Sequence, residues 1–186
     1  AERALPGSID ADSEAALEVI FKDKLSSLRL AEAGLGLVRD TRDDAFVPTR
    51  GGYGSIEGSV FAKPLGSEAS FAELFLRGSW TVSFRRGSRF ASFLRIGAEQ
   101  PFSDTEIVPL SERFFAGGSN TLRGFATDSV GGLDVLGFNA GGEALLVLNE
   151  EWHFPIWRSL RGELCLDAGN VYPTVSDFDP TDLRVD

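Results

Sequence analysis

Methionine is absent from this sequence and cysteine occurs once, and each scarcity excludes a class of protein. Cys165 alone cannot build an intrachain disulfide framework or a multi-cysteine metal site. Because a natural chain starts with methionine, we interpret these 186 residues as a processed product or a fragment.

Basic residues are scarce as well. The chain has 18 lysines and arginines against 28 acidic residues, which gives a formal charge of −10 and a pI near 4.6. Nucleic-acid binding needs a basic face, so this balance argues against a nucleic-acid partner. The sequence also lacks an apolar run near the ~18 residues of a transmembrane helix, and a basic-then-apolar signal segment. Neither absence excludes a β-barrel, because alternating strands leave little trace in hydropathy.

The strongest positive signal is a repeated period of two. Within residues 70–85, even positions carry apolar side chains such as Leu74 and Trp80, while most odd positions are polar, with two phenylalanines as exceptions. Similar alternation predicts strands in five other segments, which are Leu28–Asp40, Gly54–Val60, Ser88–Gln100, Phe138–Phe154 and Gly162–Gly169. A weaker candidate covers Ala15–Phe21. We therefore expect six or seven antiparallel strands.

These predicted strands are long, which bears on where they fold. A strand of a soluble sandwich has about five or six residues, whereas a tilted membrane strand needs about ten. One apolar face and one charged face suit a transmembrane β-barrel with a wet lumen. A soluble antiparallel barrel or sandwich with one buried face has the same pattern, so alternation alone leaves both open.

The connections of the predicted sheet alternate between its two ends. At one end the turns are "DTRDDAFVPTRGG", "RRGS" and "PIWRS", while "AKPLGSEA", residues 101–137 and the tail after Tyr172 lie at the other. Outer-membrane barrels have short periplasmic turns and longer extracellular loops. Residues 101–137 are therefore predicted to form a long extracellular loop.

One stretch of that loop carries a specific pattern. "RFFAGGSNTLRGF", Arg113 to Phe125, has too many glycines for a strand and too many aromatic residues for a solvated loop. It resembles the signature of the BamA/TamA-type outer-membrane protein assembly factors, a "[VI]RG[FY]" tetrad that often follows an "RFFAGG"-like stretch. Leu122 takes the aliphatic position of the tetrad.

Three more motifs are similar to those of that family and occur in the same order. "EWHFP" supplies Glu151 and Pro155, an acid four residues before a proline. "CLDAG" is similar to the family's "F-x-D-x-G", with Cys165 in place of phenylalanine, and "RDTRDDAFVPTRG" to its Arg/Asp-rich turn. The four motifs cover about Leu28 to Tyr172, which is more specific than a single match.

The resemblance implies an antiparallel transmembrane β-barrel of sixteen strands, of which this chain has the equivalent of strands seven or eight to thirteen. Residues 1–186 are then a partial barrel domain, with the best-matched strands in 28–172 and the loop of residues 101–137 folded inward. No POTRA-like module is recognisable in the sequence. Six or seven strands leave two open edges that lipid cannot satisfy, so we expect a fragment of a larger protein or pairing with another chain.

The resemblance also implies a site. The loop arginine, here Arg123, is expected to reach Glu151 and Asp167, whose odd positions place both carboxylates on the polar face. A guanidinium can bind a carboxylate through two parallel hydrogen bonds, a geometry that lysine cannot match. The expected structural lock comprises Arg123, Gly124, Phe125, Glu151, Asp167 and Gly169, with Gly117 and Gly118 letting the loop approach the sheet.

By this resemblance the chain helps to insert β-barrel proteins or to translocate secreted ones, and it is not an enzyme. The implied partners are outer-membrane lipid, client β-barrel or secreted proteins, and periplasmic or inner-membrane accessory proteins, with neither cofactor nor metal. The implied location is the outer membrane of a Gram-negative bacterium rather than that of an organelle. A two-partner-secretion pore shares the Arg-Gly-aromatic loop and is an alternative, as is a soluble β-sheet binding domain.

Catalytic interpretations have less support. "AGGSNTLRG" lacks the Gly-Lys-Ser/Thr ending of a phosphate loop. Glu150 and Glu151 are adjacent in a predicted strand and point to opposite faces, which disfavours a glycosidase carboxylate pair and puts Glu150 on the lipid side. His153 is the only histidine, and the sequence has no nucleophile elbow with which it could form a catalytic triad. The mixed charges of Arg39–Asp44 indicate a solvated turn rather than a cation site. We predict no catalytic residue.

Overall fold

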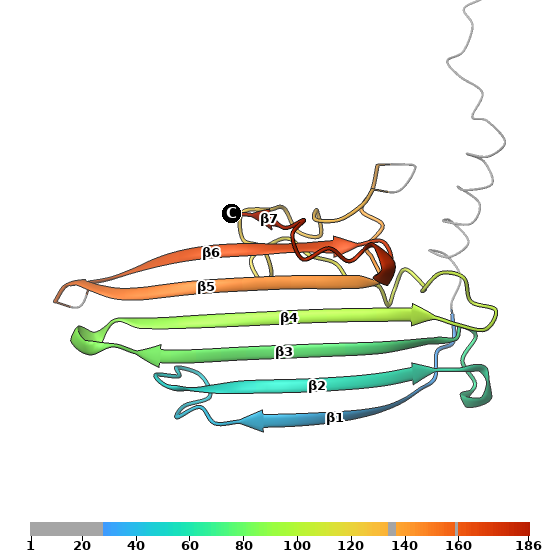
Figure 1. Cartoon of the computed structure of the whole chain (residues 1–186), viewed down its shortest axis with the longest axis horizontal. Coiled ribbons are helices and arrows are strands. Elements are labelled where there is room, and N and C mark those ends of the chain that lie inside the picture. The colour runs from blue at the N-terminus through green and yellow to red at the C-terminus, as the bar shows by residue number, and fades with distance from the viewer. Residues whose placement is uncertain (1–27, 134–136, 159) are drawn as a thin grey trace, which may run out of the picture.

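The structure, a computed structural model, describes residues 28–133, 137–158 and 160–186 and contains one antiparallel β-sheet. The strands are hydrogen-bonded in chain order (Figure 1). They are β1 (Glu32–Asp40), β2 (Gly51–Phe61), β3 (Phe71–Ser83), β4 (Arg89–Pro101), β5 (Ala144–Trp157), β6 (Leu160–Tyr172) and β7 (Arg184–Val185). Three short 3-10 helices interrupt the connections: η1 (Lys63–Leu65), η2 (Arg85–Gly87) and η3 (Val175–Asp177). In these residues, no helix has the length and apolar character needed to cross a membrane.

The predicted all-β antiparallel class is confirmed. Strands β3, β4 and β6 each run for 13 residues and β5 for 14, so the lengths that indicated membrane strands are present in the sheet. The seventh strand is the two-residue β7, which pairs with β6 at Ala168 and Gly169. The weaker candidate strand, Ala15–Phe21, lies outside the described residues.

Strand β5 begins later than the sequence predicts. Alternation extends back to Phe138, whereas the strand begins at Ala144. Gly141 has a φ of 62°, which is not an extended conformation, and Gly142 forms an isolated bridge with Phe114 of the preceding connection. The alternating residues before Ala144 therefore belong to the loop, because backbone groups among them form hydrogen bonds with other loop residues.

The connections gather at two ends of the sheet, as the sequence predicts (Figure 1). The β1–β2, β3–β4 and β5–β6 connections lie at one end, here called the short-turn end. The β2–β3 and β4–β5 connections lie at the other. The β4–β5 connection, residues 102–143, is called the long loop below. Which end faces the periplasm stays a prediction.

The two faces of the sheet follow from its register. Residues paired across neighbouring strands share a face, and one such row is formed by Ile56, Leu76, Ile96 and Leu146. This is the outer face. All nine side chains that alternation assigns to it lie there: Leu74, Leu76, Trp80, Leu94, Ile96, Leu146, Leu148, Leu164 and Leu166. The opposite, inner face carries the long loop.

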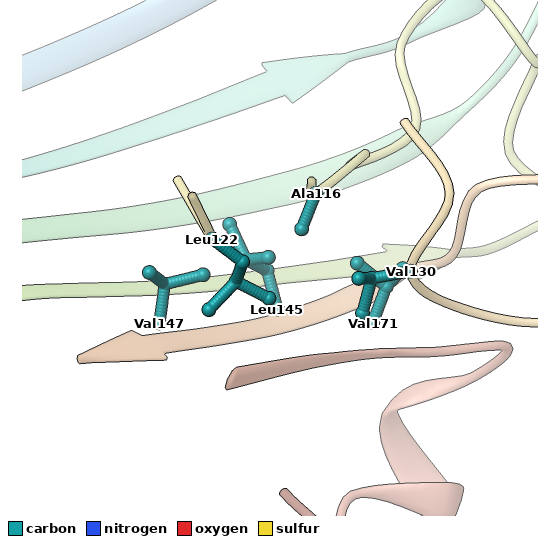
Figure 2. Close-up of a cluster of buried hydrophobic side chains, with 6 residues drawn as sticks. All are labelled: Ala116, Leu122, Val130, Leu145, Val147 and Val171. Carbon is teal, nitrogen blue, oxygen red and sulfur yellow. The ribbon is translucent and has the colours of Figure 1, made fainter. Parts of the chain in front are cut away.

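The inner face is not wet along its whole length, which corrects the expectation of a polar lumen. A buried apolar cluster joins the long loop to the sheet (Figure 2). The loop contributes Ala116, Leu122 and Val130, and the strands β5 and β6 contribute Leu145, Val147 and Val171. Phe75, one of the two phenylalanines that broke the alternation of β3, stacks on Phe114 of the loop at 5.6 Å between ring centroids. Apolar residues at inner positions therefore mark where the loop packs on the sheet.

Candidate functional site

The long loop brings Arg123 to the inner face through a compact turn. Gly117 has a φ of 116°, which favours glycine, and a Cβ there would lie 2.2 Å from the carbonyl oxygen of Ala126. The Gly117 N–H donates to Thr121 Oγ1 at 2.8 Å. These contacts fold residues 117–126 back on themselves, so that Arg123 points at β5 and β6.

Asp167 on β6 accepts three hydrogen bonds from Arg123. Nε lies 2.7 Å from Oδ2 and Nη2 lies 2.6 Å from Oδ1, so the guanidinium holds the carboxylate with two parallel bonds. The backbone N–H of Arg123 also donates to Oδ2, at 2.9 Å. Asp167 is only 1% exposed. A buried carboxylate without a partner is costly, so docking of the loop and burial of Asp167 depend on each other.

Glu151 on β5 is the second acid. Nη1 of Arg123 lies 2.8 Å from Glu151 Oε1, and 3.8 Å from Oε1 of Glu163 on β6. The hydrogen bond to Asp167, and then that to Glu151, raises the pKa of Arg123 further above its ordinary value. Arg123 is therefore a permanent cation among three carboxylates.

Sequence reasoning did not assign two further residues of β5 to this site. Asn149 Nδ2 donates to Asp167 Oδ1 at 2.9 Å and also to a carbonyl oxygen of the long loop. His153 lies between two acids, with Nε2 at 3.2 Å from Glu151 Oε2 and Nδ1 at 3.3 Å from Glu163 Oε2. The odd numbers of Asn149 and His153, shared with Glu151, were the signal that could have found both.

Close approach explains the other glycines of the predicted set. A Cβ on Gly124 would lie 1.9 Å from the side chain of Asp186, and one on Gly169 would lie 2.6 Å from a backbone oxygen of β5. The Gly118 N–H donates to the Phe125 carbonyl oxygen at 2.9 Å, and the Phe125 ring packs against the buried cluster. The structure therefore brings all the predicted site residues together around one turn.

Other charged residues set aside in the sequence have local contacts. Glu150 faces outward and accepts a hydrogen bond from Ser92 Oγ at 2.8 Å. In the turn after β1, Arg42 Nε donates to Asp40 Oδ1 at 2.9 Å, and Asp43 accepts hydrogen bonds from the turn backbone. The contacts of Asp40, Arg42 and Asp43 are those of an ordinary turn, whereas Glu150 Oε2 is buried without a hydrogen-bond partner in the described residues.

Within the described part of the chain, one group of side chains has ligand atoms close enough to share a metal ion: Glu151, Glu163 and Cys165. Arg123 already lies against both glutamates, and a guanidinium at that distance repels a metal cation. Cys165 Sγ instead donates to Glu163 Oε1 at 3.0 Å. The geometry favours ion pairing over metal binding.

The comparison with known families agrees with this arrangement. Residues 9–184 match the Omp85 superfamily domain. This chain belongs to the Omp85 superfamily. The match confirms the resemblance drawn from the four motifs and places the chain in an outer membrane, bacterial or organellar. A SAM50-like protein of Schizosaccharomyces pombe is 34% identical over 125 residues, which are 63% of this chain and 25% of the relative.

A solved Omp85 structure shows the same fold. This structure is BamA from Haemophilus ducreyi, crystallised without POTRA domains 1–3. The match covers 83% of this chain and 34% of the BamA chain, with a TM-score of 0.70 and a sequence identity of 22%. The seven-stranded sheet thus corresponds to part of the BamA barrel. This chain spans about a quarter of the length of the S. pombe relative and about a third of the BamA structure.

Proposed function

We propose that this chain is the part of an Omp85 outer-membrane protein that fixes the long loop against the barrel wall, in a protein that inserts or translocates clients. The observation that carries the proposal is the set of three hydrogen bonds from Arg123 to buried Asp167, joined by the bond to Glu151. The role is mechanical, because an ion pair of this kind sets the register of one element against another. No substrate bond is made or broken.

The proposed partners follow from the membrane setting. Lipid contacts the apolar outer face, and the clients are β-barrel proteins or secreted proteins, assisted by accessory proteins of the periplasm or inner membrane. We favour a Gram-negative outer membrane, because the four motifs resemble those of the bacterial BamA/TamA-type factors. An organelle outer membrane is the alternative, which the S. pombe relative supports.

The central test replaces Arg123 in the full-length protein. Arg123→Ala leaves Asp167 buried without its cation, which costs on the order of 1–3 kcal/mol, since the arginine side chain is itself 30% exposed. We expect the loop to become sensitive to protease and client assembly to fall. Arg123→Lys should restore only part of both, because the parallel bonds are lost. Unchanged loop protection and unchanged assembly in Arg123→Ala would refute the proposal.

Two controls separate the ion pair from general damage. Arg89 is also on the inner face, but its Nη1 donates to the Pro48 carbonyl oxygen of the β1–β2 turn at 2.9 Å, so Arg89→Ala should leave the loop protected. A double-mutant cycle of Arg123→Ala with Asp167→Asn should show coupling, because each change removes the same contact. Depletion of the protein then distinguishes insertion, which lowers membrane β-barrel levels, from secretion, which retains a client in the periplasm.

A further inference from the structure

The outer face carries a hollow that the Arg123 contact does not use. It has a volume of about 500 Å³ and lies across β1 to β4. Its floor is formed by Gly54 of β2 and Gly78 of β3, which are directly paired. Its walls include Leu37, Arg39, Ile56, Leu76, Leu94 and Ile96.

Neither backbone strain nor tight packing requires glycine at these two positions. Gly54 and Gly78 are not among the glycines with positive φ. The nearest heavy atom to a Cβ added at either would lie 4.0 Å away, compared with 2.6 Å at Gly169. Glycine weakens the interior of a strand and often marks a place where a ligand approaches. The hollow is therefore kept open where larger side chains would fit.

Arg39 places a positive charge at the end of the hollow. It is the penultimate residue of β1, is paired with Gly54 and is exposed. In the residues that the structure describes, its guanidinium has no hydrogen bond, ion pair or ring contact. Trp80 and Trp152 lie on the same face near the short-turn end, 56% and 50% exposed. Tryptophans gather where a membrane meets water, so Arg39 stands near the depth of lipid headgroups.

We propose that this hollow binds one anionic phospholipid of the leaflet at the short-turn end, with its phosphate on Arg39 and an acyl chain over Gly54 and Gly78. The inference rests on the proposed membrane setting but is independent of the Arg123 contact. Charge complementarity selects the headgroup, and the apolar walls select hydrocarbon. An arginine that merely extends to water would not need the glycine floor beside it.

Native mass spectrometry of the full-length protein tests the proposal. The protein is equilibrated in detergent with equal phosphatidylglycerol and phosphatidylcholine, and retained lipid is counted. We expect the wild type to retain phosphatidylglycerol in preference to phosphatidylcholine. Arg39→Gln should lower its retention about fivefold, the effect of one basic side chain at an anionic membrane surface. Gly78→Val fills the hollow and should lower retention at least as much, while strand stability is kept or raised.

Two matched variants serve as controls. Gly58 lies on the same strand and face as Gly54 and does not line the hollow, and a Cβ there would meet its nearest heavy atom at 3.9 Å. Gly58→Val should therefore retain lipid as the wild type does. Arg50 is an exposed arginine of the β1–β2 turn, and Arg50→Gln should also behave as the wild type. If Gly78→Val does not fold, Gly78→Ala replaces it, with a smaller loss expected.

Several results would overturn the proposal. One is equal retention of both lipids by the wild type. Another is unchanged phosphatidylglycerol retention in Arg39→Gln or in the folded Gly78 variant. A third is a loss in Arg50→Gln equal to that in Arg39→Gln, which would show an effect of general surface charge only. A dimer abolished by Gly78→Val would assign the hollow to a second copy instead. The hollow variants should leave loop protection unchanged, and Arg123→Ala should leave lipid retention unchanged. Failure of one proposal is thus distinct from failure of the other.

Discussion

At the residue scale, two neighbours in sequence hold the long loop by different forces. Leu122 is fully buried in the apolar cluster (Figure 2). The Arg123 side chain is 30% exposed and is held by carboxylates. Burial of a leucine side chain contributes about 1.5–3 kcal/mol, similar to a charged hydrogen-bond network that is partly hydrated. The loop is therefore fixed by a hydrophobic contact and an ion pair in succession.

Truncation of Leu122 tests the hydrophobic half of this attachment. Leu122→Ala should destabilise the docked loop by about 2–5 kcal/mol, because it leaves a cavity between the loop and β5. Hydrogen exchange of the loop amides would measure the effect. Leu133 belongs to the same loop but is 66% exposed, so Leu133→Ala should change exchange little. Equal effects of the two changes would contradict the assignment of Leu122 to the core.

At the scale of the strands, the two faces of one strand meet different surroundings. Leu94 of β4 lies on the outer face and is 38% exposed, whereas Ala91 on the inner face is 4% exposed. On β5, Leu148 faces outward while Val147 is fully buried under the loop. This difference follows from the pleat, since successive side chains point to opposite sides.

Cysteine labelling in the membrane tests these faces. Single cysteines at Leu94 and Leu148 should react with a lipid-soluble reagent and resist a water-soluble one, because the outer face contacts hydrocarbon. Cysteines at the inner neighbours Phe93 and Asn149 should not react with the lipid-soluble reagent. The same labelling is expected for the other outward side chains: Leu74, Leu76, Trp80, Ile96, Leu146, Leu164 and Leu166. Equal labelling of odd and even neighbours would refute a membrane-spanning sheet.

At the scale of the whole molecule, the alternation of connections sets a direction across the membrane. The β3–β4 turn covers only residues 84–88, whereas the β4–β5 connection at the opposite end is the long loop of residues 102–143 (Figure 1). Outer-membrane barrels keep short turns in the periplasm, so the short-turn end is predicted to face inward.

Epitope insertion tests this direction. An epitope at Gly87, in the β3–β4 turn, should be hidden on intact cells and revealed after permeabilisation. One at Gly66, beside η1, should bind antibody on intact cells, because that end is predicted to be extracellular. Levels of folded protein in both insertions serve as the control. The reverse pattern would invert the topology without affecting the Arg123 contact.

The sequence by itself determined the strands, their faces and the residues that could meet. Alternation is a local property, so it located β1 to β6 to within a few residues, except at the start of β5. Odd numbering put Glu151 and Asp167 on one face, and the glycines around Arg123 indicated a turn that approaches the sheet. These inferences need only the pleat of a strand and the backbone freedom of glycine.

Only the tertiary structure decided where the long loop lies, and the rest of the site follows from that. The loop covers the inner face over β5 and β6, which buries Leu145 and Val147 where a wet lumen was expected. It also brings a loop carbonyl to Asn149 and makes β5 begin only at Ala144. Each of these results comes from contacts between residues far apart in the chain, and such contacts have no periodicity that a single sequence can display.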